Sequence, residues 1–132
     1  MKYLLDTNIC VYLIKKRPQH VFARFRRLTI GDVGLSAITY AELEYGVAHS
    51  SDPAQNRMAL SEFLAPLEIL DFETRIAPLY GVLRSSLARA GKMIGPLDLL
   101  IAAHALSLGA VLVTNNVKEF SRVPDLKIDN WV

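Results

Sequence analysis

Three of the thirteen acidic residues occupy positions from which their carboxylates could act together: Asp6, Asp98 and Glu119. Asp6 directly follows an apolar stretch typical of a buried strand, and Glu119 lies shortly after a second such stretch. Asp98 stands near the start of a helix that is apolar on nearly every side, so its carboxylate would be buried and would need a partner such as a metal ion. Convergence of these acids would create a negative pocket of oxygen ligands, which suits Mg²⁺ or Mn²⁺. Such an ion can activate water and neutralise charge on a phosphate.

Each acid also has a purely structural interpretation. Asp6 is a good N-cap for the helix that follows it, and Asp98 would interact favourably with the dipole of its own helix. Glu119 has the character of an exposed acid in a first helical turn. Glu42 stands three residues after Thr39, and this spacing is typical of a capping box. The spacing alone therefore favours a structural role for Glu42.

Other kinds of catalytic site find no support in the chain. The histidines at 20, 49 and 104 lack metal-ligand spacing, and the lone Cys10 excludes an internal disulfide or a Cys-based zinc site. No nucleophile elbow, P-loop or dinucleotide-binding motif is present. A phosphatase of the haloacid type would need a second Asp where Asn8 stands.

The apolar pattern predicts an α/β fold in one domain, residues 1–132. Strands alternate with helices, which favours a mainly parallel sheet covered on both faces, with functional sites beyond the carboxyl ends of its strands. Strands are expected at 3–5, 33–37, 67–70, 110–113 and 126–128. Helices are expected at 8–16, 18–28, 39–49, 51–64, 74–90 and 95–108.

The composition indicates a folded protein with a partner. Hydrophobic residues make up 52% of the chain, and the mean hydropathy is +0.25. We therefore do not expect disorder. We do expect an apolar surface patch that another protein covers. Charges interrupt every apolar run, and the N-terminus lacks the features of a signal peptide, so we expect a cytoplasmic protein without a membrane span.

The net charge of +2 is unevenly placed. Residues 7–31 contain no acid but carry Lys15, Lys16, Arg17, Arg24, Arg26 and Arg27. Residues 74–97 also lack acids and carry Arg75, Arg84, Arg89 and Lys92. These two basic stretches either follow a phosphate backbone or form solvated helix faces.

Four motifs in order resemble a known family. They are the segments Tyr3–Asn8, Ala41–Gly46, Ile94–Asp98 with the apolar helix up to His104, and Val113–Asn116 followed by Glu119 and Phe120. Their order and spacing resemble the PIN domain, and essentially the whole chain is similar to VapC toxins of the enteric type.

This resemblance implies a three-layer α/β/α sandwich, a Mg²⁺ or Mn²⁺ cofactor and hydrolysis of RNA phosphodiesters. It assigns Asp6 and Asp98 as metal-holding acids and adds Glu42 as the third acid of the core trio, against the capping-box interpretation. Many PIN domains have Asp where this chain has Asn116, so either Glu119 or Asn116 is the fourth ligand. The catalytic set is then Asp6, Glu42, Asp98 and Glu119, with Thr7, Asn8, Thr114 and Asn115 as polar supports.

The resemblance further implies a VapB-type antitoxin, a homodimer and an RNA substrate. Enteric VapC toxins cut initiator tRNA in the anticodon loop, which makes tRNA the expected substrate. Two other functions stay open: an RNA-processing PIN nuclease without an antitoxin, and an inactive PIN-like binding module. An inactive module should lack one acid of the trio, whereas all three are present here.

Overall fold

The computed structural model describes residues 1–132 and contains a five-stranded sheet in the order β3-β2-β1-β4-β5. All neighbouring strands are parallel, and β1 lies at the centre. Leu4 in β1 pairs with Gly34 in β2 and with Leu112 in β4. The strands are β1 (Tyr3–Leu5), β2 (Val33–Ser36), β3 (Glu68–Leu70), β4 (Val111–Val113) and β5 (Ile128–Asp129). The structure thus confirms the α/β fold and the parallel sheet.

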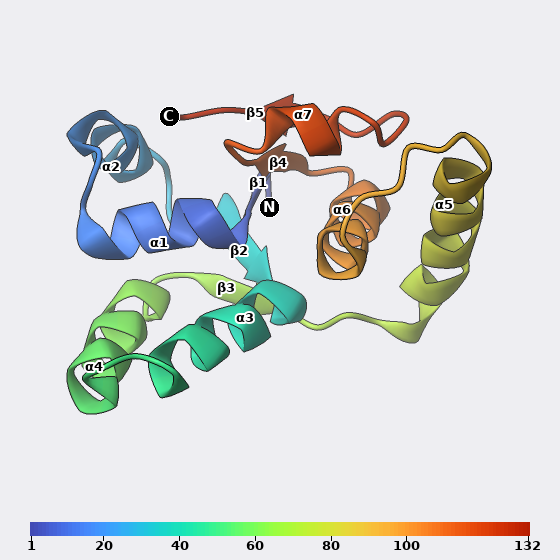
Figure 1. The fold of residues 1–132 in the computed structure, drawn as a ribbon. Coiled ribbons are helices and arrows are strands. Elements are labelled where there is room, and N and C mark those ends of the chain that lie inside the picture. Colours follow the sequence, from blue (N-terminus) through green and yellow to red (C-terminus); the bar gives the residue numbers. More distant parts are fainter.

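Helices cover both faces of this sheet and form a three-layer α/β/α arrangement (Figure 1). Leu4 faces the layer of α5 and α6, whereas Leu5 faces the layer that contains α1, α2 and α4. This alternation follows because successive strand residues point to opposite faces. The helices are α1 (Thr7–Lys15), α2 (Gln19–Arg26), α3 (Ala37–Ala48), α4 (Pro53–Leu64), α5 (Ala77–Arg89), α6 (Pro96–Leu108) and α7 (Val117–Phe120).

Local signals explain where most helices begin and end. Pro96 occupies the first turn of α6, where its missing N–H costs nothing. Gly109 ends the same helix at a φ of 63°, a left-handed conformation that glycine adopts readily. In α4, Pro53 has the same place as Pro96, and the Asp52 side chain accepts the Gln55 N–H. None of the helices is both long and apolar enough to cross a bilayer.

The expected start of α3 is wrong. The helix begins at Ala37 because Ser36 acts as its N-cap: the Ser36 hydroxyl accepts the Ile38 N–H at 3.1 Å. Thr39 therefore lies inside the helix, where it is buried and its side-chain hydroxyl has no hydrogen-bond partner. The capping box between Thr39 and Glu42 does not form, since Glu42 accepts a hydrogen bond from Thr7 instead.

Two other elements differ from the predicted ranges. The segment expected as one helix at 74–90 starts as a 3-10 turn (Thr74–Ile76) that leads into α5. The four-residue α7 was not predicted. It matters for the site, because it carries Glu119 and fixes the position of that side chain relative to the end of β4.

Candidate metal and catalytic site

Asp6 lies at the carboxyl end of the central strand, where hydrogen bonds fix both of its carboxylate oxygens. Oδ1 accepts the Thr7 backbone N–H at 2.7 Å, and Oδ2 accepts the Thr114 hydroxyl at 2.7 Å. Thr114 is in reach because Leu5 of β1 pairs with Val113 of β4, so the residues that follow them are neighbours. Burial raises the pKa of Asp6, and the two hydrogen bonds oppose this rise. Thr114, one of the polar residues that the family resemblance implies as supports, therefore contacts Asp6 directly.

Glu42 reaches the same edge from α3. The hydroxyl of Thr7 donates to Glu42 Oε1 at 2.8 Å. Thr7 therefore holds two acids at once, since its backbone N–H binds Asp6 and its hydroxyl binds Glu42. One residue at the start of α1 fixes the spacing between the end of β1 and the second turn of α3.

Asp98 shows most clearly that the acids share one electrostatic environment. It lies in the first turn of α6 and is half-buried. Burial first, and then the negative charges of Asp6, Glu119 and Glu42, raise the pKa of Asp98 to about 6. None of the ion pairs in the chain includes any of these four acids. The cluster is therefore a concentration of negative charge without a basic partner.

The side chain of Glu119 is held by Asn116, the residue that stands where many PIN domains have Asp. The Asn116 side-chain amide donates to Glu119 Oε2 at 3.0 Å, and the Asn116 backbone N–H donates to Thr114 Oγ1 at 2.9 Å. Asn116 therefore connects Glu119 to the hydroxyl that binds Asp6. In this arrangement Glu119 supplies the fourth charge and Asn116 orients it.

Two of the expected polar supports lie outside this network. The side chain of Asn115 donates to the Tyr12 hydroxyl at 2.9 Å and binds none of the acids. Asn8 is exposed and makes no side-chain hydrogen bond. Thr7 and Thr114 are thus the members of the predicted polar set that contact the acids directly.

A buried polar pair that the sequence patterns did not predict lies between α3 and α6. Ser36 Oγ lies 2.7 Å from His104 Nδ1, and both residues are buried. Burial lowers the pKa of His104, which favours the neutral ring. The pair joins the start of α3, which carries Glu42, to the middle of α6, which carries Asp98. The position of Ser36 at the end of a strand, just before a helix, was the signal that could have revealed it.

The donor set fits a hard divalent cation held mainly by water. As the side chains stand, no three Asp, Glu, His or Cys residues lie close enough together to bind one ion jointly. Mg²⁺ commonly uses only one or two carboxylates and keeps several waters. Asp6 and Asp98 supply two such carboxylates, Glu42 and Glu119 add negative charge, and no thiol or imidazole is among them. This chemistry suits Mg²⁺ or Mn²⁺ better than zinc.

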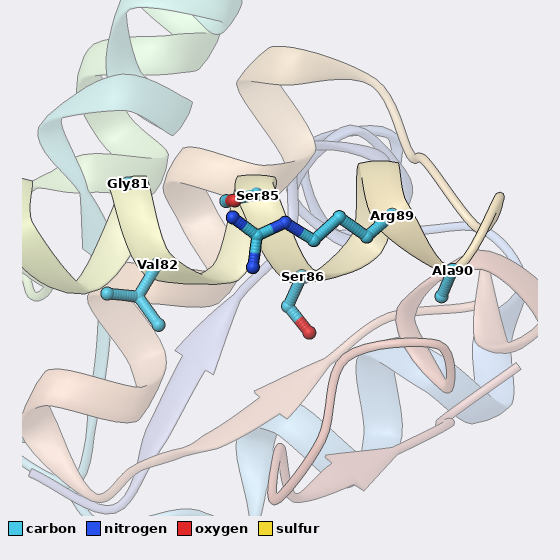
Figure 2. Close-up of a pocket in the computed structure, with 6 residues that line it drawn as sticks. All are labelled: Gly81, Val82, Ser85, Ser86, Arg89 and Ala90. Atoms are coloured by element: carbon cyan, nitrogen blue, oxygen red, sulfur yellow. The ribbon is translucent and has the colours of Figure 1, made fainter.

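The largest surface hollows differ in their relation to the acids. One groove of about 450 Å³ runs between α1, α3 and α4, and its lining includes Thr7, Glu42, Lys15, Val11 and Leu60. Of the four acids, Glu42 lines this groove, next to Thr7, whose hydroxyl it binds. Another hollow lies along the outer face of α5 and contains no acid (Figure 2). The first groove is thus part of the candidate site, and the second is not.

Comparison with known proteins agrees with this geometry. The PIN domain family model matches residues 3–126. The chain is 47% identical to "Ribonuclease VapC2" of Rickettsia felis over 99% of this chain and 98% of that protein. It is 43% identical to "tRNA(fMet)-specific endonuclease VapC" of Salmonella typhimurium over 99% of this chain and 98% of that protein.

A solved structure shows the same fold. The match is to the structure described as VapBC2 from Rickettsia felis bound to a DNA fragment from their promoter, at 46% identity. The two chains superpose with a TM-score of 0.93 over 100% of each. The fold, the four acids and these similarities lead to one conclusion: this chain belongs to the PIN-domain family, within the group of VapC ribonucleases.

Proposed function

We propose that the chain is a Mg²⁺- or Mn²⁺-dependent endoribonuclease that acts in the cytoplasm as the toxin of a toxin–antitoxin pair. The observation that carries this proposal is a network of acids without a basic partner at the carboxyl end of the sheet: Thr7 connects Asp6 to Glu42, and Thr114 with Asn116 connects Asp6 to Glu119. Burial and the charges of these acids raise the pKa of Asp98. Such a cluster is costly unless a cation neutralises it. The names of the relatives support the ribonuclease activity.

The residues of the cluster have distinct tasks in this proposal. Asp6 and Asp98 hold the ion, and Thr7 and Thr114 keep the Asp6 carboxylate in one orientation. The bound ion supplies water activation and neutralises charge on the phosphate. Glu42 or Glu119 accepts the proton of the attacking water, as a general base must.

A matched pair of variants tests the nuclease. Purified wild-type protein should cut RNA with Mg²⁺ or Mn²⁺ and stop cutting in the presence of a chelator. Asp98→Asn should lower the rate by several orders of magnitude, while Asp71→Asn, an exposed acid without a hydrogen bond, should match the wild type. Cutting that survives both the chelator and Asp98→Asn would overturn the proposal.

We also propose tRNA as the substrate, cut in the anticodon loop of initiator tRNA. This finer step is supported by the resemblance and by the name of the Salmonella typhimurium relative. Single-stranded loops present splayed bases that a small domain can bind. Incubation with total tRNA, followed by mapping of new 5′ ends, should show cuts in one anticodon loop. Equal cutting of unstructured RNA of any sequence would favour a general nuclease instead.

The basic stretches contribute unequally to the proposed phosphate contacts. Arg24 is paired with Asp129, and Arg75 is paired with Glu73. Lys15 instead lines the groove that also contains Thr7 and Glu42. Lys15 is therefore the basic residue best placed to hold a phosphate next to the cluster.

A VapB-type antitoxin is the proposed partner, and the groove between α1, α3 and α4 is where we place its toxin-binding segment. The apolar lining of the groove, which includes Val11, Ile14 and Leu60, suits an apolar segment, and Glu42 at one end suits an Arg from the same segment. A related structure from Mycobacterium tuberculosis, 26% identical to this chain, is described as a member of the VapBC family of toxin–antitoxin systems. Expression of this chain alone should arrest growth, and co-expression of the antitoxin should restore it. Harmless expression of the folded wild-type protein would contradict the toxin role.

A further inference from the structure

Tyr45 and His49 form an aromatic pair on the surface of α3. Their rings are nearly parallel, at 14°, with centroids 5.3 Å apart. Tyr45 is 67% exposed, and His49 is also exposed. Two stacked rings in solvent offer a flat, rigid surface of the kind that planar ligands bind.

The pair lies on the same stripe of α3 as Glu42. Tyr45 follows Glu42 by three positions and His49 follows it by seven, so the three residues lie on one face of the helix. The rise per residue puts Tyr45 about 4.5 Å further along the helix axis than Glu42. Side chains on a helix lean towards its N-terminus. Because His49 covers Tyr45 from the C-terminal side, the free face of the Tyr45 ring is the one towards Glu42.

The stability of α3 does not explain the pair. Arg57 of α4 makes a two-pronged hydrogen bond to Glu44, and Leu43 and Val47 are buried in the core. These contacts attach α3 to its neighbours through other faces. An aromatic pair four residues apart adds only about 0.2 to 0.5 kcal/mol to a helix. Tyr45 is therefore free to bind a ligand.

We propose that Tyr45, backed by His49, is a stacking platform for one base of single-stranded RNA, adjacent to the phosphodiester that the acids address. This inference rests on the proposed ribonuclease function. The base next to the scissile bond must lie close to the acids, and Tyr45 stands one helical turn beyond Glu42 on the same stripe of α3. On the opposite flank of Glu42, Lys15 in the α1–α3–α4 groove offers a positive charge for the phosphate of the same strand. Charge and stacking thus match an RNA strand that crosses Glu42.

The platform should add affinity without reading sequence. Stacking of a base on an aromatic side chain contributes about 1 to 3 kcal/mol and tolerates any base. At an exposed site we expect the lower end, so Tyr45→Ala should raise KM for RNA about five- to tenfold while kcat stays within about twofold. Tyr45→Phe keeps the ring and should behave like the wild type.

Binding can be measured directly through a new tryptophan. The chain has one Trp, and Trp131 is buried. In the Asp98→Asn background, which prevents cutting, Tyr45→Trp would place an indole on the platform. A short single-stranded RNA should quench its fluorescence saturably, and a duplex of the same sequence should do so far less. The matched control is Met58→Trp on α4, where Met58 is 66% exposed.

The outcomes separate this inference from the proposed function. If the wild type cuts no RNA, the ribonuclease proposal fails, whereas quenching at Tyr45→Trp still reports whether the platform binds bases. If the wild type cuts RNA but Tyr45→Ala leaves KM unchanged, or quenching is equal at Met58→Trp, the platform is overturned. Loss of antitoxin binding in Tyr45→Ala with an unchanged KM would assign Tyr45 to the antitoxin and would also overturn it.

Discussion

Replacing Asp98 with Asn should make the chain more stable at pH 8 when no divalent ion is present. In the folded protein the pKa of Asp98 is about 6, against an ordinary value of 3.8. Its folded-state pKa is thus raised, so the carboxyl favours folding only while it is protonated. That contribution is complete below about pH 4 and is lost as the pH rises through about 6. Asn cannot ionise and avoids this loss.

The magnitude follows from the same pKa. One pKa unit corresponds to about 1.4 kcal/mol, which sets an upper limit of about 3 kcal/mol for the whole displacement. Asp98 is only half-buried, and solvent screens its repulsion from Asp6, Glu119 and Glu42. We therefore expect Asp98→Asn to gain about 1 to 2 kcal/mol at pH 8, which corresponds to a Tm increase of roughly 3 to 8 °C.

Thermal and urea unfolding in a chelating buffer at pH 4 and pH 8 would measure this difference. The gain should appear at pH 8 and vanish at pH 4, and Asp71→Asn should show it at neither pH. Addition of Mg²⁺ should stabilise the wild type more than the variant and so narrow the gap. A variant that is no more stable than the wild type at pH 8, or that gains equally at both pH values, would refute the reasoning that burial and the neighbouring acids destabilise the charged Asp98 carboxylate.

Three further changes test other parts of the structure. Thr114→Val should destabilise the fold by about 2 kcal/mol in urea unfolding and weaken Mn²⁺ binding, because the Asp6 carboxylate loses a buried donor, while Thr114→Ser should retain both properties. Ser36→Ala should cost about 1 to 2 kcal/mol in the same assay, because it removes both the cap of α3 and the partner of His104. Val82→Glu should convert the expected homodimer to a monomer in light scattering if dimers form through the outer face of α5, where Val82 is exposed among small side chains; an unchanged mass would exclude that face.

The limits of most elements follow from signals that lie close together in the chain. The run from Pro96 to Gly109 shows this, because both punctuating residues are adjacent to the apolar pattern they enclose. The start of α3 could not be predicted from such local signals, because Ser36 and Thr39 are both good N-caps. The tertiary structure determines which of the two caps the helix. Ser36 is the N-cap because its hydroxyl accepts the Ile38 N–H and also contacts the His104 ring. His104 is 68 residues away along the chain, so this contact cannot be predicted from local sequence.

The site shows the same division between local and distant information. That Asp6 ends a strand can be predicted, but its contact with Thr114 depends on β4 being the neighbour of β1. The apolar pattern does not specify that order. Asn116 presents a similar case: its substitution for a family Asp was visible, whereas its bond to Glu119 requires α7, a helix too short to recognise from periodicity. The residue types of the site could thus be recognised in the sequence, but the contacts between residues that are distant in the chain could not.

The order of the strands also affects the biosynthesis of the site. β1 is synthesised first, yet one of its two neighbours in the sheet is β4, at residues 111–113. Until that segment leaves the ribosome, the apolar central strand keeps an open edge, and neither Thr114 nor Glu119 exists to complete the acid cluster. The acid cluster is therefore incomplete for most of translation and can form only after the last third of the chain has been synthesised. In an active toxin, this delay would give an antitoxin that is already present in the cell time to bind before the first RNA is cut.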